Sequence, residues 1–505
     1  MLAPWAQDEM KTAHLEDRRL NQRLTQLLSD LGQRPTASIP AACGGYNETV
    51  AAYRFFDNDH VTPQAILQPH YHATRLRLPA HPTILAIQDT SELDCTRPHQ
   101  PVQGAGPLDG SKRRGAFLHT LQTFTPDGTP LGSIWTQMWT RDPDDPRSTE
   151  EKKKDRREAP IEEKESFRWL EGLRQTRAVA QELPTTRLVC VADSEADLYE
   201  LFAEPRGVVP VHLLIRCCHH DRTLLPPTNP QPAPPDGTAE TAETAEAARQ
   251  LRERVQATPV LFTKEISVRG RDPKVACDQR SRRQPRQSRT ATVEVRATTV
   301  TLQPPKRSDR QLPVVTLNAV LVQEINPPLE DVAVEWLLLT TLPIETLEQV
   351  REIVQYYAVR FLIEVFFRVL KSGCRVESRR FEQMERLLPC VALYLIVAWR
   401  TLMVCRLGRS CPELNCEAVF EPCEWQAVWM VTHQSSPPST PPPLQEMVRW
   451  IAQLGGYVNR PNRADPPGPQ TVWLGLQRMQ DLVWAWQTFG PGAATAKARI
   501  APKEG

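Results

Sequence analysis

Residues 357–371 read Tyr357-Ala-Val-Arg360-Phe-Leu-Ile-Glu364-Val-Phe-Phe-Arg-Val-Leu-Lys371, and this stretch decides both the fold and the chemistry. The four numbered residues follow one another at spacings of three, four and seven. At about 100° per residue they share one face of a helix, within roughly 60° of one another. The opposite face is apolar, which predicts a helix that packs on a core. That face consists of Val359, Leu362, Ile363, Phe366, Phe367, Val369 and Leu370.

The polar face of this expected helix combines a carboxylate, two cations and a phenol. Glu364 offers oxygen ligands to a divalent metal. Arg360, Lys371 and Tyr357 are side chains that hold phosphate oxygens. The combination indicates phosphoryl transfer on nucleic acid. A solvated face with ion pairs between neighbouring turns is the alternative interpretation.

Two upstream segments add carboxylates. The runs Thr83-Ile-Leu-Ala-Ile-Gln-Asp89 and Leu188-Val-Cys-Val-Ala-Asp193 are short and apolar and end in aspartate. Each predicts a buried strand with an acid at its end, where α/β proteins usually place their sites. Two-metal phosphoryl transfer needs about three converging carboxylates, so Asp89, Asp193 and Glu364 form a candidate triad. Either aspartate alone also suits a turn or a helix N-cap.

Together these residues resemble the signature of DDE transposases of the insertion-sequence-four family, most closely the Tn-five type. The family pattern Tyr-x2-Arg-x3-Glu-x6-Lys is complete in this chain, and further matches follow in the family's order over roughly residues 5 to 410. Two positions depart from the Tn-five type: Phe361 replaces a tryptophan, and Ser194 replaces an arginine. The further matches are Ala52–Asn58, Gln88–Ser91, Glu163–Ser166 with Trp169, Asp193–Leu198, Glu324–Pro328 and Trp336–Thr340.

The resemblance implies an α/β fold: an RNase H-like core, with a mixed sheet flanked by helices and a β-strand insertion, between N-terminal and C-terminal helical domains. It assigns Asp89, Asp193 and Glu364 to catalysis and to two Mg²⁺ ions, for which Mn²⁺ can substitute. It implies cut-and-paste transposition, with end nicking, strand transfer and in some members a hairpin step. The implied partners are double-stranded transposon-end and target DNA and a second copy of the chain in a synaptic homodimer. The expected DNA contacts are Tyr357, Arg360, Lys371, Arg216, His219, Arg222, Trp336 and Arg54.

The structural alternatives at several of these positions stay open. Trp336 either stacks on a flipped base, as the resemblance implies, or begins a buried strand. Phe55 and Phe56, beside Arg54, suit helix packing better than DNA contact. Arg216, His219 and Arg222 follow an expected strand at residues 208–215, where a cation-rich strand end fits phosphate binding.

Composition and resemblance together predict the domain order. A Pro-rich tract followed by Thr-Ala-Glu repeats cannot build a core and predicts a flexible loop; a later Ser/Pro tract predicts a linker. We expect a helical DNA-end-binding domain at 5–75, a catalytic core at 78–410 with a loop at 224–248 and a β-rich insertion at about 205–340, a linker at 434–443, and a C-terminal helical region at 444–490 suited to dimerisation.

The chain has 505 residues, is 40% hydrophobic and carries a formal net charge of +1, so it can bury several cores and is not a basic coat protein. The sequence has no run of about 18 uncharged apolar residues, so we expect no membrane span. Its first residues lack the charged segment followed by an apolar segment that is typical of a signal peptide, so we expect none. Twelve cysteines without regular spacing suit a reducing compartment. We expect a cytoplasmic protein of the bacterial cytosol or nucleoid, with no membrane partner.

Three other functions fit the sequence. An RNase H-like nuclease without strand transfer would share the triad. A catalytically silent, domesticated DNA-binding protein would keep the fold, although the intact acids argue against decay. A zinc-dependent regulatory factor would depend on Cys405, Cys411, Cys416 and Cys423, which lack a C-x2-C pair and neighbouring histidines.

Overall fold

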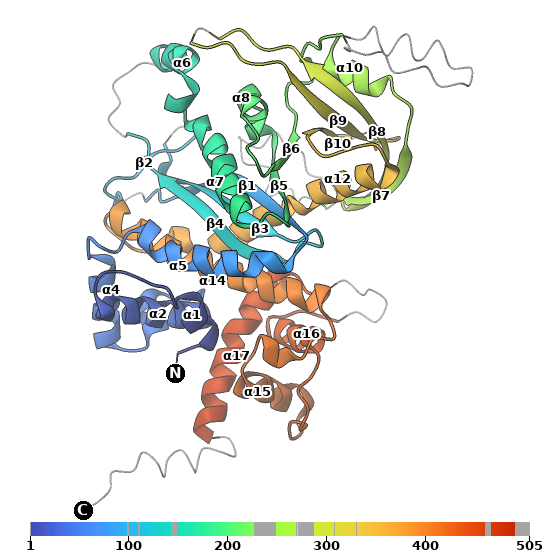
Figure 1. Ribbon diagram of the computed structural model, residues 1–505. Coiled ribbons are helices and arrows are strands. Elements are labelled where there is room, and N and C mark those ends of the chain that lie inside the picture. The colour runs from blue at the N-terminus through green and yellow to red at the C-terminus, as the bar shows by residue number, and fades with distance from the viewer. Residues whose placement is uncertain are drawn as a thin grey trace, which may run out of the picture.

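A ten-stranded mixed sheet forms the centre of the computed structural model (Figure 1). The strand order is β2-β3-β1-β5-β6-β10-β9-β8-β7, and β4 pairs with β3. The strands are β1 Thr83–Asp94, β2 Gly106–Pro107, β3 Arg114–Phe124, β4 Pro130–Trp139, β5 Arg187–Ala192, β6 His212–Arg216, β7 Phe262–Val268, β8 Arg289–Leu302, β9 Val315–Glu324 and β10 Glu335–Thr340. The structure describes residues 2–97, 100–109, 112–142, 149–226, 249–268, 270, 287–307, 309–329, 331–459 and 466–489.

The sheet combines two kinds of pairing. Strand β3 is antiparallel to both β1 and β4, whereas β1, β5 and β6 are parallel neighbours. Parallel strands need crossover connections, which α7 (Arg168–Glu182) and α8 (Tyr199–Ala203) supply before and after β5. The strands beyond β6 are antiparallel and extend the sheet. The predicted mixed sheet with flanking helices is therefore confirmed.

Side chains alternate between the two faces of the central strands, because successive residues of a strand point to opposite sides. Leu85 of β1 and Val189 of β5 belong to the same core as helices α12 to α14. Their neighbours Ala86 and Cys190 belong to the core under α7. Any polar residue that continues the first series faces α12 to α14.

Helix α14 (Met384–Ser410) is the central helix of the structure. It contacts strand β4 and the helices α2, α5, α16 and α17. It is long and apolar enough to cross a membrane, but 83% of its most apolar window is buried inside the protein. This burial identifies α14 as a core helix.

The other helices include an N-terminal group and a C-terminal group, which lie in the lower half of Figure 1, whereas α6 and α10 lie near its top. The N-terminal group is α1 Pro4–Glu9, α2 Arg18–Gln33, α3 Ile39–Cys43, α4 Tyr46–Phe56 and α5 Pro63–Arg77; then come α6 Thr149–Glu158, α10 Leu251–Gln256, α12 Leu347–Val359 and α13 Phe361–Arg368; the C-terminal group is α15 Pro422–His433, α16 Leu444–Leu454 and α17 Pro469–Phe489.

A buried arginine fixes the N-terminal helices to the segment that follows α13. Arg379 is 5% exposed, and its guanidinium donates hydrogen bonds to the backbone carbonyls of Pro35, Ala37 and Cys374. The same guanidinium lies 4.4 Å from the ring centroid of Tyr394 on α14. One side chain therefore joins the N-terminal helices, the end of the α13 region and the central helix.

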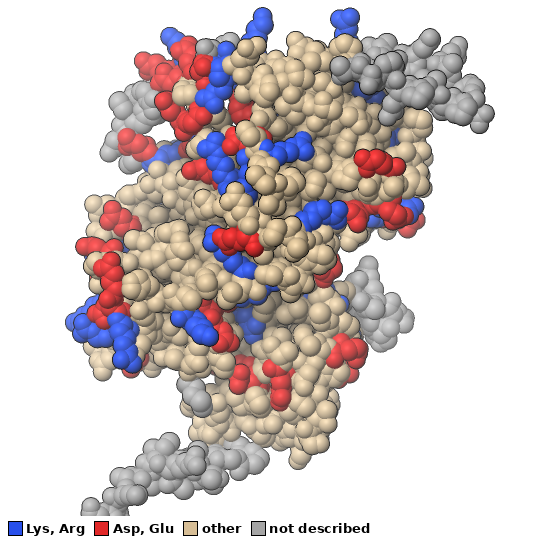
Figure 2. Space-filling view, in the orientation of Figure 1, with Lys and Arg blue, Asp and Glu red and all other residues tan. Residues whose placement is uncertain are grey.

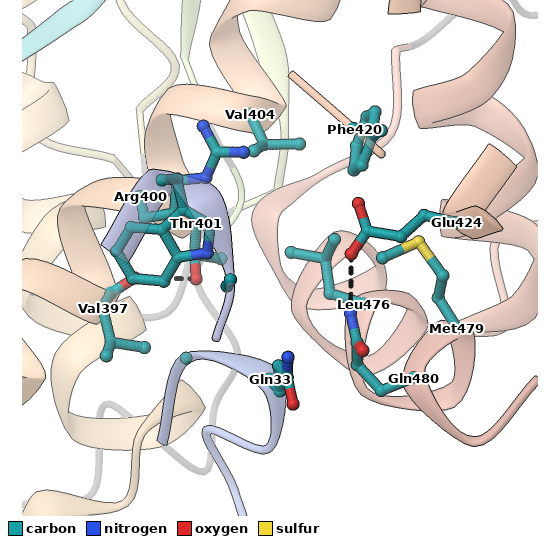
Figure 3. Close-up of a pocket in the computed structure, with 13 residues that line it drawn as sticks. Gln33, Val397, Arg400, Thr401, Val404, Phe420, Glu424, Leu476, Met479 and Gln480 are labelled. Atoms are coloured by element: carbon teal, nitrogen blue, oxygen red, sulfur yellow. Dashed lines mark hydrogen bonds between the residues drawn. The ribbon is translucent and has the colours of Figure 1, made fainter. Parts of the chain in front are cut away.

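The N-terminal and C-terminal helices meet beside a cavity of about 40 Å³, which is lined by Trp5 and Gln33 from the first group and by Glu424 and Gln480 from the second (Figure 3). Arg400 of α14 donates to the carbonyl of Val419 at 2.6 Å, and Glu424 of α15 accepts from Gln480 of α17 at 2.9 Å. Burial lowers the pKa of Arg400 to about 10 and raises the pKa of Glu424. The two terminal regions thus share a buried polar junction on α14.

Two expectations concern connecting segments. Most of the expected flexible loop at 224–248, residues 227–248, lies outside the described residues. The expected linker at 434–443 connects α15 to α16.

On the face shown in Figure 2, basic and acidic side chains are interspersed in small groups, in keeping with the net charge of +1.

A candidate catalytic site of three carboxylates

The register of two parallel strands brings the two aspartates together. Ile87 of β1 pairs with Val191 of β5, an offset of 191 − 87 = 104 residues. The same offset places Asp89 beside Asp193 (193 − 89 = 104). Both continue the series of side chains that faces α12 to α14, so they lie on the same face of the sheet.

Only one of the two aspartates lies at a strand end. Asp193 directly follows β5, and its side chain accepts a hydrogen bond from the backbone N–H of Glu195 at 3.0 Å. Asp89 lies inside β1, because β3 continues to pair with β1 as far as Asp94. The prediction that a strand ends at Asp89 is therefore wrong, although the pairing of β1 with β5 does end just before it.

The segment that carries Glu364 is not one uniform helix. Helix α12 ends at Val359, α13 begins at Phe361, and residues Val369–Gly373 form a π-helical turn. Around Arg360 the backbone hydrogen bonds join residues three apart instead of four. The N–H of Arg360 donates to the carbonyl of Tyr357, and the N–H of Ile363 donates to the carbonyl of Arg360. The prediction of a single regular helix from Tyr357 to Lys371 is therefore wrong, because it assumes 100° per residue throughout.

Arg360 joins the acid of the helix to an acid of the sheet. Its Nη1 lies 3.3 Å from Oδ2 of Asp89, and its Nη2 lies 2.5 Å from Oε1 of Glu364. The side chains of Arg360 and Asp89 are 12% and 13% exposed, and that of Glu364 is 40% exposed. A guanidinium thus occupies the space between two of the three carboxylates.

Burial and nearby acids raise the pKa of Asp89 above its ordinary value. Burial, and after it the charge of Asp193, raise the pKa of Asp89 to about 7, and Glu364 adds a smaller effect in the same direction. Arg360 opposes this rise, and its own pKa is raised by Tyr357 and the surrounding acids against the effect of burial. Burial and the neighbouring acids together therefore outweigh the effect of Arg360 on Asp89.

The donor set fits a hard divalent cation. Three carboxylates from β1, the end of β5 and α13 supply oxygen ligands, which Mg²⁺ and Mn²⁺ prefer. The oxygens are not drawn tightly together, because Arg360 stands between Asp89 and Glu364. Among the described residues, one group of His, Cys, Asp and Glu has ligand atoms within 4.8 Å of one another, and it consists of Asp197, Cys218 and His219.

Tyr357, Trp336 and Arg216 form an aromatic and basic corner next to Arg360. The rings of Tyr357 and Trp336 lie 5.3 Å apart at 62°. Burial raises the pKa of Tyr357, and the positive charges of Arg360 and Arg216 oppose this rise. Arg216 ends β6 and donates to the carbonyl of Glu335 at 3.3 Å. Trp336 is half-buried near the start of β10, so it begins a strand and also keeps part of its ring accessible.

The remaining expected DNA contacts lie in three different surroundings. Lys371 lies on the π-helical turn, 3.7 Å from Glu377. Arg54 is exposed on α4, whereas its neighbours Phe55 and Phe56 are buried at 2% exposure each, as the packing interpretation predicted.

His219 and Arg222 follow β6 and differ in exposure and in their partners within the protein. The His219 side chain is exposed. Arg222 donates to the fully buried Asp197 carboxylate at 2.5 Å. Arg222 therefore anchors this loop internally, a partner that the sequence did not indicate.

Sequence reasoning missed Arg168, which connects the two aspartate-bearing segments. Its Nε donates to Thr90 of β1 at 2.9 Å, and its Nη2 to Glu195, just after Asp193, at 3.2 Å. Its Nη1 donates to the carbonyl of Glu165 at 2.7 Å. The only sign of it in the sequence was the surrounding segment, which resembles the family, because Thr90 and Glu195 lie far away in sequence. It also supplies a cation near the position where Ser194 lacks one.

The cysteines proposed for zinc are separated in burial and surroundings. Cys405 and Cys416 are buried, Cys423 is half-buried and Cys411 is exposed. Over the described residues, these four cysteines form no group of closely spaced metal ligands. The structure gives the zinc-factor alternative no support.

Comparison with known proteins finds three transposase families along the chain. The models described as transposase DNA-binding, transposase DDE domain and transposase Tn5 dimerisation domain match residues 2–61, 144–395 and 396–488. The chain thus carries the DNA-binding, DDE and dimerisation domains of a transposase, and belongs to that class. The C-terminal match, at residues 396–488, is to a dimerisation domain described as that of the Tn5 transposase. Members of the DDE family generally use divalent metal ions.

The matched ranges differ from the expected ones at three points. The DNA-binding match ends at residue 61, whereas the expected domain ends at residue 75. The DDE match includes Asp193 and Glu364 but begins after Asp89. The dimerisation match begins within α14, well before residue 444.

One solved structure is also similar, a cryo-EM structure of a piggyBac transposase synaptic complex with hairpin DNA. The two chains are 10% identical with a TM-score of 0.35, over 81% of this chain and 73% of the other. A TM-score of this size does not establish a shared fold.

Proposed function

We propose that this chain catalyses cut-and-paste DNA transposition by metal-dependent phosphoryl transfer, as a member of the insertion-sequence-four family. The observation that carries the proposal is the contact of both Asp89 and Glu364 with Arg360, with Asp193 beside Asp89, in a chain with matches to transposase domains. The order of the central strands, β4-β3-β1-β5-β6 with three antiparallel and two further parallel members, supports an RNase H-like core.

Asp89, Asp193 and Glu364 are the proposed ligands of two Mg²⁺ ions, with Mn²⁺ as a substitute. When bound, such ions activate water or a DNA 3′-hydroxyl and stabilise the leaving oxygen. The protein contributes fixed carboxylates from a parallel strand pair and a packed helix, so that little reorganisation is needed during the reaction.

Arg360 has two proposed roles. Without metal, it forms ion pairs with Asp89 and Glu364 and offsets part of their negative charge. With metal and DNA bound, its guanidinium and the ammonium of Lys371 offset the charge of the reacting phosphate. Tyr357 donates a hydrogen bond to a nearby phosphate, and Arg216 supplies a further cation at the same corner.

Half-buried Trp336 is the proposed stacking surface for an extrahelical base, because a base can stack on an accessible indole. Arg54 and His219 are exposed and are proposed contacts to transposon-end DNA. The N-terminal helices at 5–75, the core at 78–410 and the C-terminal helices at 444–490 act as DNA-end-binding, catalytic and dimerisation regions in a cytoplasmic synaptic homodimer.

The direct test replaces Glu364 by glutamine, which keeps the shape and removes the charge. We expect Glu364→Gln to lower cleavage of an end-containing duplex in Mg²⁺ by about 10³-fold or more, with end binding unchanged in a gel-shift assay. Glu348→Gln is the matched control, because Glu348 is an exposed helical glutamate on α12 whose side chain is 77% exposed. Cleavage by Glu364→Gln at the wild-type rate would refute the triad.

A second assay separates a transposase from a nuclease with the same site. A pre-cut transposon end bearing a 3′-hydroxyl is incubated with target DNA and Mg²⁺, and joined products are measured. A transposase joins the end, whereas a nuclease only cleaves. Cleavage without joining would favour the nuclease.

A further inference from the structure

The loop that follows β6 contains a dense run of side chains that bind soft metals. Residues 217–221 read Cys-Cys-His-His-Asp, and short Cys/His-rich tracts are typical of metal binding. None of these residues belongs to the carboxylate triad. The loop begins at Arg216, one end of the aromatic and basic corner described above.

Two of these side chains converge on a buried carboxylate from another segment. One oxygen of Asp197, one ring nitrogen of His219 and the sulfur of Cys218 all lie within 4.8 Å of one another. The Asp197 side chain is fully buried, whereas Cys218 and His219 are exposed. An ion in solution therefore reaches the thiol and the imidazole from outside.

Backbone contacts hold this arrangement in place before any ion arrives. Oδ2 of Asp197 accepts the backbone N–H groups of Cys218 and His219 at 2.8 and 3.0 Å. Its Oδ1 accepts from Arg222 at 2.5 Å. A carboxylate offers about four lone-pair positions. These three hydrogen bonds take three of them, and the thiols of Cys217 and Cys218 also hydrogen-bond to this carboxylate, so a metal would replace a thiol contact.

We propose that Asp197, Cys218 and His219 form a second metal site, separate from the triad, for a zinc-like thiophilic divalent cation. One sulfur, one nitrogen and one oxygen ligand suit zinc or cobalt and not magnesium, which prefers oxygen alone. The bond lengths of a tetrahedral zinc site put ligand atoms roughly 3.3 to 3.6 Å apart, so the three atoms need to close by little more than an ångström.

Charge and protons balance in this step. The thiol of Cys218 binds as thiolate and releases its proton to solvent. The dication then faces one thiolate and one carboxylate, while Arg222 keeps its hydrogen bond to the other carboxylate oxygen. Because the imidazole of His219 is a metal ligand here, bound metal withdraws it from the surface that it offers to DNA.

Cobalt provides a direct readout, because Co²⁺ bound to thiolate absorbs strongly in the near ultraviolet and Co²⁺ bound to carboxylates alone does not. The full-length protein, stripped of metal, is titrated with Co²⁺. We expect a thiolate-to-cobalt band that reaches a plateau with the intensity of one thiolate-bound ion per chain and disappears when Zn²⁺ is added.

Three variants identify the ligands. Cys218→Ser should lose the band, and His219→Ala should weaken Co²⁺ binding by more than about 100-fold, since even second-shell changes cost 10- to 100-fold. Cys411→Ser is the matched control, because Cys411 is also exposed but lies after α14; it should keep the band.

Glu364→Gln removes one triad acid and should also keep the band, so failure of the triad and failure of this site are distinguishable. Circular dichroism confirms that each variant is folded. If Cys218→Ser does not fold, Zn²⁺ protection of Cys218 from alkylation in the wild type, read by peptide mass mapping, replaces it. Absence of the band in the wild type, its persistence in Cys218→Ser, or unprotected Cys218 would overturn the proposal.

Discussion

The guanidinium of Arg360 lies 3.3 Å from the carboxylate of Asp89, although 271 residues separate them in sequence. This contact fixes α13 against β1 and brings the acid of the helix to the acids of the sheet. Arg360, which the sequence suggested for phosphate binding, thus also forms an ion pair inside the protein.

Removing that cation should destabilise the metal-free protein. We expect Arg360→Gln to lower the free energy of unfolding by about 3 kcal/mol, because buried Asp89 loses its counter-charge. Mg²⁺ or Mn²⁺ should raise the Tm of the variant more than that of the wild type. Arg351→Gln on α12 is the control, since its pair with Glu348 is exposed and such pairs contribute about 0.5 kcal/mol. Equal losses in the two variants would contradict this role.

The raised pKa of Asp89 predicts a pH dependence of stability. The folded pKa is about 7 against an ordinary value of 3.8, so between these values the folded state binds more protons than the unfolded state. Stability of the metal-free protein therefore falls as pH rises through this window. Other carboxyls act in the opposite direction; Glu9, for example, has its pKa lowered to about 2 by His70 and Arg77 against the effect of burial.

The contribution of Asp89 is isolated by comparison with Asp89→Asn. Urea unfolding in EDTA at pH 5 and pH 8 should show that the variant gains stability relative to the wild type as pH rises. Saturating Mg²⁺ should reduce this gain, because a bound cation favours the ionised carboxylate. A constant difference between the two proteins across pH would show that Asp89 titrates normally.

Arg168 should control metal use without binding metal. It joins Thr90 to Glu195 and so fixes the spacing of Asp89 and Asp193. We expect Arg168→Gln to raise the Mg²⁺ concentration for half-maximal cleavage by about tenfold, with end binding preserved. Arg174→Gln on the same helix, whose partner Glu204 lies away from the site, should behave as wild type. A lower rate with unchanged metal dependence would assign Arg168 a purely structural role.

Arg379 should determine how firmly the N-terminal helices are attached. Arg379→Met leaves the carbonyls of Pro35, Ala37 and Cys374 without their donor, which should cost about 3 kcal/mol of stability. Limited proteolysis should then cut earlier near residues 34–38. Arg380→Met, at an exposed neighbouring position, is the control. Equal protease resistance of the two variants would argue against the anchor.

Local apolar patterning was sufficient to predict parts of the fold. The run Leu188–Ala192 is a continuous apolar segment and forms nearly all of β5, as expected of a strand buried on both faces. The same reasoning placed the end of β1 too early, because the residues after Asp89 are polar yet still pair with β3. Pairing with a distant strand has no local signal.

The helix of the candidate site shows a second limit of sequence reasoning. Spacing at 3.6 residues per turn grouped Tyr357, Arg360 and Glu364, and the structure keeps the latter two in contact. The spacing gave no sign of the interruption at Arg360 or of the wider π-helical turn that carries Lys371. The roles of Arg168 and Asp197 depend on partners far along the chain, which spacing does not reveal.

The neighbouring positions of the two strand aspartates depend on five consecutive backbone pairings, from Thr83 with Arg187 to Ile87 with Val191. This register does not depend on the number of residues in the segment that connects the two strands. Related genes are therefore free to gain or lose loop codons between β1 and β5 during evolution. Deleting one codon inside β5 instead turns Asp193 towards the α7 layer.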